Sequence, residues 1–363
     1  MNKTNLEKRI YNAQCYGNIE PIEYMVPYPN LHALVEGQNV KYKDHLLYHD
    51  LSMTNEDFFI RVQKAAHWLK ASGVRPKDKV MMAGLPFPTA EIIAFGIWTM
   101  GAILVLTAQN DLKTAKTACQ PIFIVPPELD LEKEIDVFDE QFIPAFKPNL
   151  QEEAVIYWRD EKAIRLSHYN LLINANGIQK KLDLFEKDSF YIKLKADSTA
   201  WVILQAILPL YTGAGITSKN PKITISLPTQ FDSADYIVDF DWTELKNTTP
   251  LHLYIKPENT AVLAIGSSPV HMTAIEKDNQ HLKISGHSVM MGYLDEKENE
   301  KIFMKKKIER IKELFSKLPN WAQVIVVLIL FVAAMFLWVI IWDFIRPFTI
   351  KWFLNPLGYI IIL

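Results

Sequence analysis

The sequence predicts an α/β protein with mixed or parallel sheets, followed by an amphipathic helix and one transmembrane helix. Helical and strand-like hydrophobic patterns alternate between residues 54 and 107, which favours helices packed on a sheet. A stretch of 19 residues, 324–342, contains no charge, proline or glycine and is long enough to cross a bilayer as one helix. With 49% hydrophobic and 22% charged residues, the 363-residue chain can bury one large core or two smaller ones.

The first helix of the predicted α/β unit runs between Thr54 and Gly73. Its apolar side chains recur with helical period at Phe58, Val62, Ala65, Ala66 and Leu69. Thr54 is a suitable N-cap and Gly73 a suitable stop. A buried strand over 79–85, a helix over 89–100 and a strand over 102–107 follow. This β-α-β order predicts a parallel sheet covered by helices.

Many positions in this region match the opening of a known family. They are Leu51, Thr54, Phe58, Arg61, Val62, Leu69, Gly73, Val74, Asp78, Val80, Pro86, Glu91, Ala94, Gly101 and Ala102. The pattern resembles the adenylate-forming, AMP-binding enzymes, in particular the acyl-CoA synthetases. The resemblance implies a truncated acyl-CoA synthetase-like N-terminal domain over roughly residues 27–298. These matches concern the fold and not the chemistry.

The block Ala154–Ile178 resembles the phosphate-binding region of that family, where a Gly/Ser/Thr loop joins a strand to a helix. The strand Ala154–Tyr157 and the helix start Ser167–Leu171 are both recognisable. The intervening loop, 158–166, has no glycine and is shorter than the family's loop. The resemblance therefore fails where the family binds phosphate.

The composition of this loop also opposes phosphate binding. Without glycine, the loop is expected to resist the positive φ angles of an anion nest. Asp160 and Glu161 place two carboxylates where phosphate oxygens would lie, and they would repel a triphosphate. The alternative is that Lys162 or Arg165 still binds phosphate.

Later blocks of the resemblance are incomplete as well. Trp201–Thr217 is similar to the family's next helix and strand, but residues 191–200 lack the histidine of an acyl pocket. Only 40 residues run from Gly215 to Tyr254, so we expect the acyl-tunnel and adenine-binding elements to be trimmed. Gly266–Leu294 resembles a turn and a small β-element that carry no catalysis.

Glu258 is the single residue that falls on a catalytic motif of the family, whose threonine and glutamate serve phosphate and magnesium. Pro257 replaces the threonine and Ile255 replaces a glycine. A lone carboxylate is a poor magnesium site, because Mg²⁺ is usually held by carboxylates together with substrate phosphates. Glu258 is therefore a weak cofactor-binding candidate, and we expect it to be a solvated loop acid.

No other group of residues predicts an enzyme, and we predict no catalytic residue, no metal and no cofactor. Cys15 and Cys119 have no metal-ligand spacing and are interpreted as reduced thiols. The neighbours Ser167 and His168 are interpreted as helix-capping residues, not as a nucleophile and its base. A net charge of −2 gives no indication of nucleic-acid binding.

The predicted transmembrane anchor is marked by aromatic residues and is preceded by basic residues. Its marker residues are Trp321, Val324, Trp338 and Trp342. Juxtamembrane basic residues precede it at Lys305, Lys306, Lys307, Arg310 and Lys312. This charge excess predicts a cytoplasmic N-terminal domain. The apolar stripe of 304–318 predicts a helix on anionic lipid, and a solvated spacer is the alternative.

Five parts are therefore predicted. They are an N-terminal arm (1–26), an AMP-binding-like pseudoligase domain (27–298), a basic amphipathic juxtamembrane helix (299–320), a transmembrane helix (321–343) and an apolar interfacial or partner-binding tail (344–363). The predicted function is that of a catalytically inactive accessory subunit of a membrane complex. Its predicted partners are membrane lipids, other integral membrane subunits and a soluble protein. The alternative is an acyl, acyl-CoA or nucleotide binder, or a residual acyl-adenylating ligase.

Overall fold

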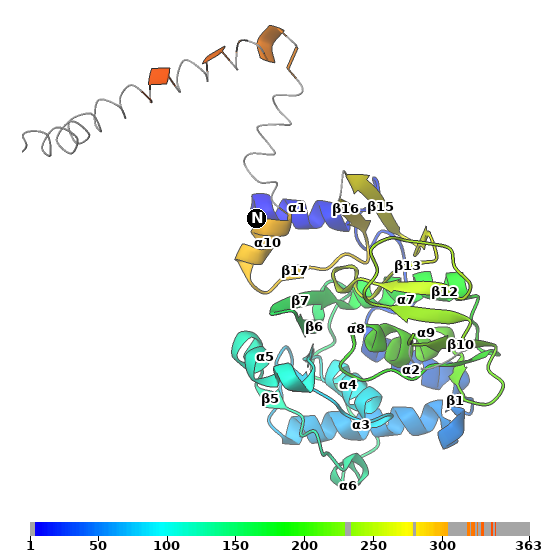
Figure 1. Cartoon of the computed structure of the whole chain (residues 1–363). Helices are drawn as coiled ribbons and strands as arrows, with labels where there is room; N and C mark the ends of the chain where they lie inside the picture. The colour runs from blue at the N-terminus through cyan, green and yellow to red at the C-terminus, as the bar shows by residue number, and fades with distance from the viewer. Residues whose placement is uncertain are drawn as a thin grey trace, which may run out of the picture. The chain divides into compact units, whose positions relative to one another are not determined.

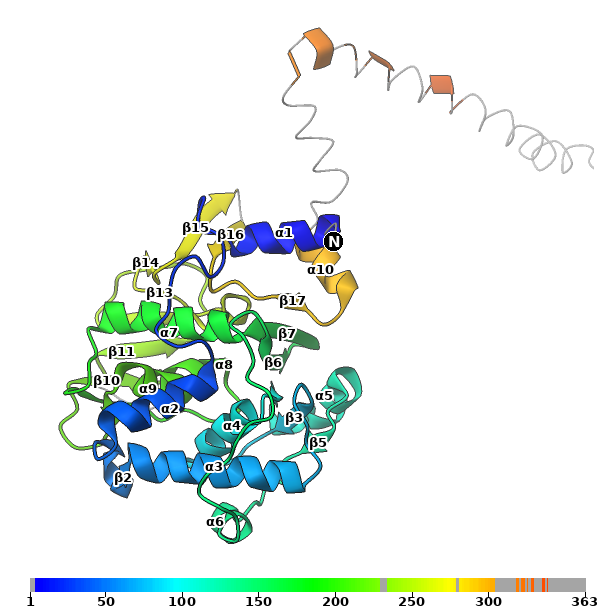
Figure 2. The same ribbon diagram turned by 180° about the vertical axis from the view of Figure 1, so that it is seen from behind.

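A computed structural model describes residues 4–228, 234–278 and 281–303, together with positions 318, 319, 321–323, 325, 328, 329, 335, 336 and 338. The chain divides into two units, Met1–Phe303 and Met304–Leu363. Figures 1 and 2 show the helices and strands of the first unit from opposite sides.

Six strands form the sheet that contains the predicted β-α-β unit. In spatial order they are β17 (Gly292–Tyr293), β7 (Lys162–Ser167), β6 (Glu153–Arg159), β4 (Ile103–Leu106), β3 (Lys79–Met82) and β5 (Phe123–Ile124). The neighbours among β6, β4, β3 and β5 are parallel, whereas β7 and β17 join antiparallel. Helix α4 (Thr89–Thr99) connects β3 to β4, which confirms the predicted β-α-β unit.

Nine strands form a second, mixed sheet. In spatial order they are β14 (Ser268–Pro269), β13 (Val262–Ile265), β12 (Leu251–Ile255), β11 (Tyr236–Asp239), β10 (Ile223–Ser226), β8 (Ser189–Tyr191), β9 (Gly215–Ile216), β1 (Leu46–Tyr48) and β2 (Met53–Thr54). The pairs from β1 to β12 are parallel, and the pairs at both edges are antiparallel. A separate hairpin joins β15 (Thr273–Asp278) to β16 (His281–Gly286). Mixed sheets were predicted, and the structure confirms them.

Helices cover these sheets and separate them. The remaining helices of the first unit are α1 (Asn5–Gln14), α2 (Leu31–Tyr42), α3 (Asn55–Ala71), α5 (Leu112–Cys119), α6 (Leu131–Ile135), α7 (His168–Leu182), α8 (Thr199–Trp201), a π-helix (Val202–Ile207), α9 (Leu208–Thr212) and α10 (Glu296–Phe303). Short 3₁₀ turns occur at His49–Leu51, Gln109–Asp111 and Pro257–Asn259. Helix α7 contacts β6 and β7 of the first sheet and β13 of the second (Figure 2), so it connects the two sheets.

The predicted helix after Thr54 has the expected ends. The Thr54 hydroxyl accepts a hydrogen bond from the Asp57 backbone N–H at 3.0 Å, which completes a capping box. Helix α3 stops just before Gly73, which has a φ of +89°. It packs closely on α4, because a Cβ added to Gly96 would lie only 3.0 Å from the Ala65 methyl. Glycine at this position therefore sets the distance between the two helices.

A carboxylate is completely buried where α4 meets the π-helix. Glu91 Oε1 accepts hydrogen bonds from Trp201 Nε1 at 2.7 Å and from Gln205 Nε2 at 2.8 Å. Its second oxygen has no hydrogen-bond partner among the described residues. Burial raises the pKa of Glu91 to about 7, although the bonds from Gln205 and Trp201 oppose that rise. Glu91 is therefore largely neutral below pH 7.

The predicted N-terminal arm, 1–26, contains a helix that the sequence analysis did not predict. It contains α1, which docks on the body of the domain. Gln14 Nε2 donates to the carbonyls of Val289 at 3.2 Å and Met290 at 3.0 Å. Arg9 donates to the Phe303 carbonyl at 3.4 Å, at the end of α10. A local signal for this helix was present in the capping box of Thr4 and Glu7, whereas its docking could not be predicted because its partners lie almost 300 positions away.

The predicted anchor lies mostly beyond the part of the chain that the structure describes. Among the described residues, no helix has the length and apolar character needed to cross a membrane. Trp321 and Trp338 are described as helical and exposed, whereas Val324 and Trp342 lie outside the described residues. The basic residues Lys305, Lys306, Lys307, Arg310 and Lys312 also lie outside them, as does the tail 344–363.

Candidate functional site

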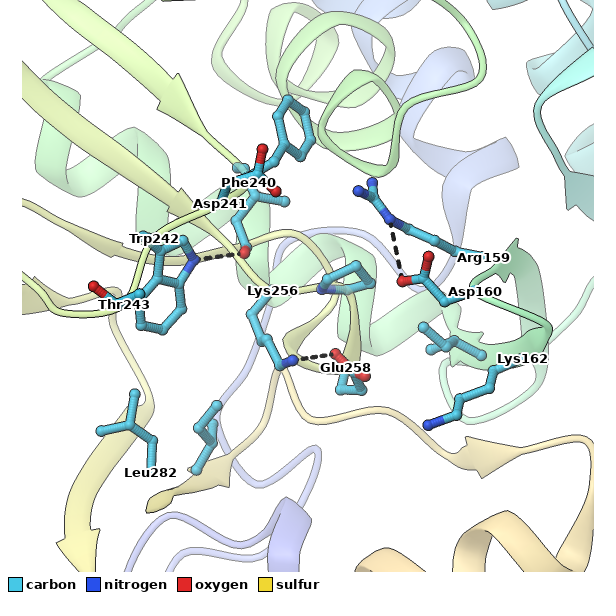
Figure 3. Close-up of a pocket in the computed structure, with 14 residues that line it drawn as sticks. Arg159, Asp160, Lys162, Phe240, Asp241, Trp242, Thr243, Lys256, Glu258 and Leu282 are labelled. Carbon is cyan, nitrogen blue, oxygen red and sulfur yellow. Dashed lines mark hydrogen bonds and ion pairs between the residues drawn. The ribbon is translucent and has the colours of Figure 1, made fainter. Parts of the chain in front are cut away.

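A cleft of about 620 Å³ brings together segments that the sequence analysis had singled out separately (Figure 3). It lies between the β6–β7 hairpin, the segment after β11, the segment after β12, and strand β16. Its polar lining consists of Arg159, Asp160, Lys162, Asp241, Thr243, Lys256 and Glu258. Its apolar lining consists of Ile164, Phe240, Trp242, Ile255, Pro257, Leu282 and Ile284. The cleft is therefore lined by polar and apolar residues in equal number.

One wall of the cleft is a tight hairpin, and this corrects the prediction of a loop over 158–166. Strands β6 and β7 pair antiparallel up to Arg159 and Lys162. Only Asp160 and Glu161 remain in the turn, with φ angles of +50° and +60°. Two consecutive positive φ angles are typical of the two-residue turn that suits the twist of a β-hairpin. The expectation that a loop without glycine would resist positive φ was therefore wrong.

Of the two basic residues in the hairpin that could bind phosphate, only one lies at the cleft. Lys162 lines the cleft, as the alternative prediction required. Arg165 does not line it, because its guanidinium binds Glu153 through Nε at 2.9 Å and a second nitrogen at 3.3 Å. Such forked contacts fix an arginine in place. Of the two phosphate-binding candidates, only Lys162 faces the cleft.

The cations of the cleft have carboxylates beside them. Arg159 Nε lies 3.7 Å from Asp160 Oδ2, and Lys256 Nζ lies 3.2 Å from Glu258 Oε2 (Figure 3). Lys162 Nζ lies 3.5 Å from a carboxylate oxygen of Glu298 in α10. The positive wall is thus largely neutralised by the protein itself, which weakens its attraction for an external anion.

Glu258 is not the solvated loop acid that we predicted. Its side chain is 27% exposed, and its Oε1 accepts a hydrogen bond from the Tyr293 hydroxyl at 3.0 Å. Burial raises the pKa of Tyr293, and the nearby Glu258 carboxylate raises it further. The Lys256 ammonium lies 3.2 Å from the other oxygen, which accepts no hydrogen bond among the described residues, and this positive charge opposes magnesium binding at Glu258. The described residues contain no cluster of three His, Cys, Asp or Glu side chains suited to a metal.

An aromatic residue that the sequence analysis did not single out forms another wall. Trp242 Nε1 donates to the Ile255 carbonyl at 2.8 Å, and its ring packs edge-on against Tyr254 with centroids 5.5 Å apart. The Phe240 ring lies 5.6 Å from the Arg159 guanidinium carbon. The available signal was the Phe-Asp-Trp run directly after a buried strand, because side chains at the ends of parallel strands often line ligand sites.

Ser167 and His168 have different structural roles. Ser167 caps α7, and its hydroxyl accepts from the Asn170 N–H at 3.1 Å, as predicted. His168 does not cap its own helix. Its Nδ1 accepts from the Leu31 N–H at 3.4 Å in the first turn of α2. Burial lowers the pKa of His168 to about 3, so the ring stays neutral and acts as this acceptor.

Comparison with known proteins identifies the fold. No protein-family description matches the chain, and no curated protein matches it. Among solved structures, the NpsA N-terminal subdomain of Klebsiella oxytoca is similar, with a TM-score of 0.63 and 13% identity over 75% of this chain and 91% of that one. VinN in complex with L-aspartate is similar, with a TM-score of 0.61 and 12% identity over 73% of this chain and 92% of that one.

A third similar structure is a longer protein. It is NpsA-ThdA from Klebsiella oxytoca, an artificially fused adenylation and carrier-protein di-domain of a nonribosomal peptide synthetase. Its TM-score is 0.62 at 14% identity, over 76% of this chain and 66% of that one. This chain therefore spans slightly less than two thirds of the fused protein. Such low identities concern the fold alone, and on that basis the chain has the fold of the N-terminal part of an adenylation domain.

Proposed function

We propose that this chain is a catalytically inactive adenylation-like domain that serves as an accessory subunit of a membrane complex. The observation that carries the proposal is the two-residue turn Asp160–Glu161. The resemblance places a phosphate-cradling loop at this position. A two-residue turn has few backbone N–H groups to offer, and its two side chains are acidic.

The charges around the cleft support the same proposal. A triphosphate approaching Lys162 or Lys256 would compete with a carboxylate that lies within 4 Å of each ammonium. Since both lysines are more than a third exposed, solvent screening limits each pair to about 1 kcal/mol or less. The Asp160 carboxylate adds repulsion at the mouth of the cleft. Binding of a polyanion is therefore disfavoured before any chemistry begins.

We expect the full-length protein to show no ATP–pyrophosphate exchange with fatty, aryl or amino acids. The reason is the lack of a phosphate cradle and of a free magnesium carboxylate. The measurement is exchange of labelled pyrophosphate into ATP, with an active adenylation enzyme run in parallel. Exchange that depends on acid and disappears in Glu258→Ala would contradict the proposal.

The membrane part of the proposal is supported by the sequence of the second unit. The uncharged stretch 324–342 and the basic residues before it support an anchor with the first unit on the cytoplasmic side. Within that stretch only Ala333 and Ala334 are small enough to let another membrane helix approach closely, which limits helix–helix packing by the span itself. The tail 344–363 is then free to bind other integral subunits, while the first unit recruits a soluble partner.

Truncation before Trp321 is expected to release the protein from its membrane complex. The truncated chain retains the compact unit up to Phe303 and the basic segment 304–318, and it loses the proposed membrane span and the tail. The measurement is co-migration with other chains after purification from native membranes in mild detergent, followed by mass spectrometry. Full-length Glu258→Ala serves as the control and should still co-migrate. A truncated chain that stays fully associated would contradict the subunit proposal.

A second function, that of a ligand-binding protein, is favoured by the volume of the cleft. About 620 Å³ is within the range of small-molecule sites, and Trp242 and Phe240 offer aromatic surface for a ligand. This candidate includes acyl, acyl-CoA or nucleotide binding without turnover. Calorimetric titration with a non-hydrolysable ATP analogue and with acyl-CoA distinguishes it, since saturable binding that Trp242→Ala abolishes would establish this function.

A further inference from the structure

The positive charge of Lys162 in the cleft is paired with a carboxylate from a segment far along the chain. The Glu298 carboxylate lies in α10, 136 positions after Lys162, and its Oε2 is 3.5 Å from Lys162 Nζ. Its other oxygen binds the Lys301 ammonium one turn later on the same helix. The Glu298 side chain is only 19% exposed. It therefore supplies Lys162 with a partly shielded counter-charge that strand β7 does not provide.

Helix α10 is held in place by contacts that converge on the same wall. The Asn299 side chain exchanges two hydrogen bonds with the Tyr293 backbone, at 2.6 and 2.8 Å. Tyr293 pairs with Ile164 in β7, and the Lys162 ammonium lies 5.5 Å from the Tyr293 ring centre. The Tyr293 hydroxyl also donates a hydrogen bond to Glu258 Oε1. Lys162, Glu258 and α10 are thus joined through Tyr293.

We infer that Glu298 is a built-in counter-anion of Lys162 at the edge of this cleft, so that an external anion at Lys162 competes with the Glu298 carboxylate and, where it displaces this carboxylate, loosens α10. The inference rests on the proposed non-catalytic function of the same cleft and deepens it. It assigns to the cleft a regulated anion site whose occupancy is coupled to the helix that leads into residue 304. A phosphate or carboxylate group has the chemistry to compete with Glu298, because both are oxyanions of comparable size.

The direct test is calorimetric titration of the full-length chain with inorganic pyrophosphate. Glu298→Gln removes the charge at constant size, and it is expected to bind pyrophosphate at least tenfold more tightly than the wild type. Glu300→Gln is the matched control, since Glu300 is exposed on the same helix, and it should bind as the wild type does. The double variant Glu298→Gln/Lys162→Gln should lose the gain.

Coupling to α10 has its own readout. At saturating pyrophosphate, hydrogen exchange of the wild-type amides of residues 293–303 is expected to accelerate, because the Lys162–Glu298 contact is lost. Glu298→Asp withdraws the carboxylate by one methylene and keeps its charge, so an intermediate affinity is expected if Glu298→Gln does not fold. Unchanged exchange at saturation would overturn the coupling.

Two outcomes separate this inference from the proposed function. Equal pyrophosphate affinity in wild type and Glu298→Gln would overturn the built-in anion, whereas the lack of adenylation would stand. A gain in Glu298→Gln that persists after Lys162→Gln would also overturn it. Conversely, ATP–pyrophosphate exchange by the wild type would overturn the proposed function, and the competition between Glu298 and an external anion would stand.

Discussion

Glu91→Gln is expected to stabilise the protein at pH 8 by on the order of 3 kcal/mol and to leave its stability near pH 4.5 almost unchanged. Burial raises the pKa of Glu91 from 4.5 to about 7, so the folded state holds a proton that the unfolded state has released. The contribution of this proton is fully present below pH 4.5 and is lost as the pH rises to about 7. Glutamine is neutral throughout, and its oxygen accepts the same bonds from Trp201 and Gln205.

Denaturant unfolding of the full-length chain at pH 5, 6.5 and 8 measures this effect. The wild type should lose stability across this range more steeply than Glu91→Gln. Glu134→Gln is a suitable control, because Glu134 is exposed on α6 and its replacement should leave the slope unchanged. Parallel pH dependences for wild type and Glu91→Gln would mean that Glu91 is already charged in the folded protein.

Asn174→Ala is expected to lower the free energy of unfolding by about 3 kcal/mol, the cost of leaving a buried backbone group without its partner. Asn174 Oδ1 accepts from the Val262 N–H at 3.2 Å, and its Nδ2 donates to the Val262 carbonyl at 2.8 Å. Asn174 is fully buried in α7, and Val262 begins β13. These two hydrogen bonds therefore join α7 to the nine-stranded sheet.

Thermal and denaturant unfolding measure the overall loss, and amide exchange locates it. The Val262 amide should exchange much faster in Asn174→Ala, since its acceptor is gone. Asn12→Ala in the exposed face of α1 is the control and should change stability by less than about 0.5 kcal/mol. If the Val262 amide stayed protected, the helix-to-sheet bond would not contribute as described.

Local patterns predicted the elements whose formation depends on neighbouring residues. Helix α3, with its Thr54 cap, and the β3-α4-β4 unit follow from periodicity, capping chemistry and glycine positions. The fold of an adenylation domain was implied by the family resemblance over 27–298, and the solved structures agree with it. In these segments the local preference and the tertiary arrangement coincide.

The errors have an identifiable cause. Residues 158–166 were assigned to a loop because the resemblance places a loop there, although strand-forming residues flank Asp160 and Glu161 and fit a hairpin equally well. Glu258 was assigned to solvent because its partner Tyr293 lies 35 positions later. The carboxylate on Lys162 comes from Glu298, at an even greater separation. Contacts of this kind depend on how the chain folds back, which no local pattern records.

The docking of α1 has a consequence for how the protein is made. The Arg9 contact to Phe303 spans 294 positions, and the Gln14 contact to Met290 spans 276. At a synthesis rate of about 5–20 residues per second, roughly 15–60 s pass between the appearance of the first and the last of these partners. Helix α1 therefore cannot begin to dock before β16 and Met290 have emerged from the ribosome, and its contact with α10 forms last. Attachment of the N-terminal helix is thus a closing step of assembly, completed only when the chain has been synthesised past residue 303.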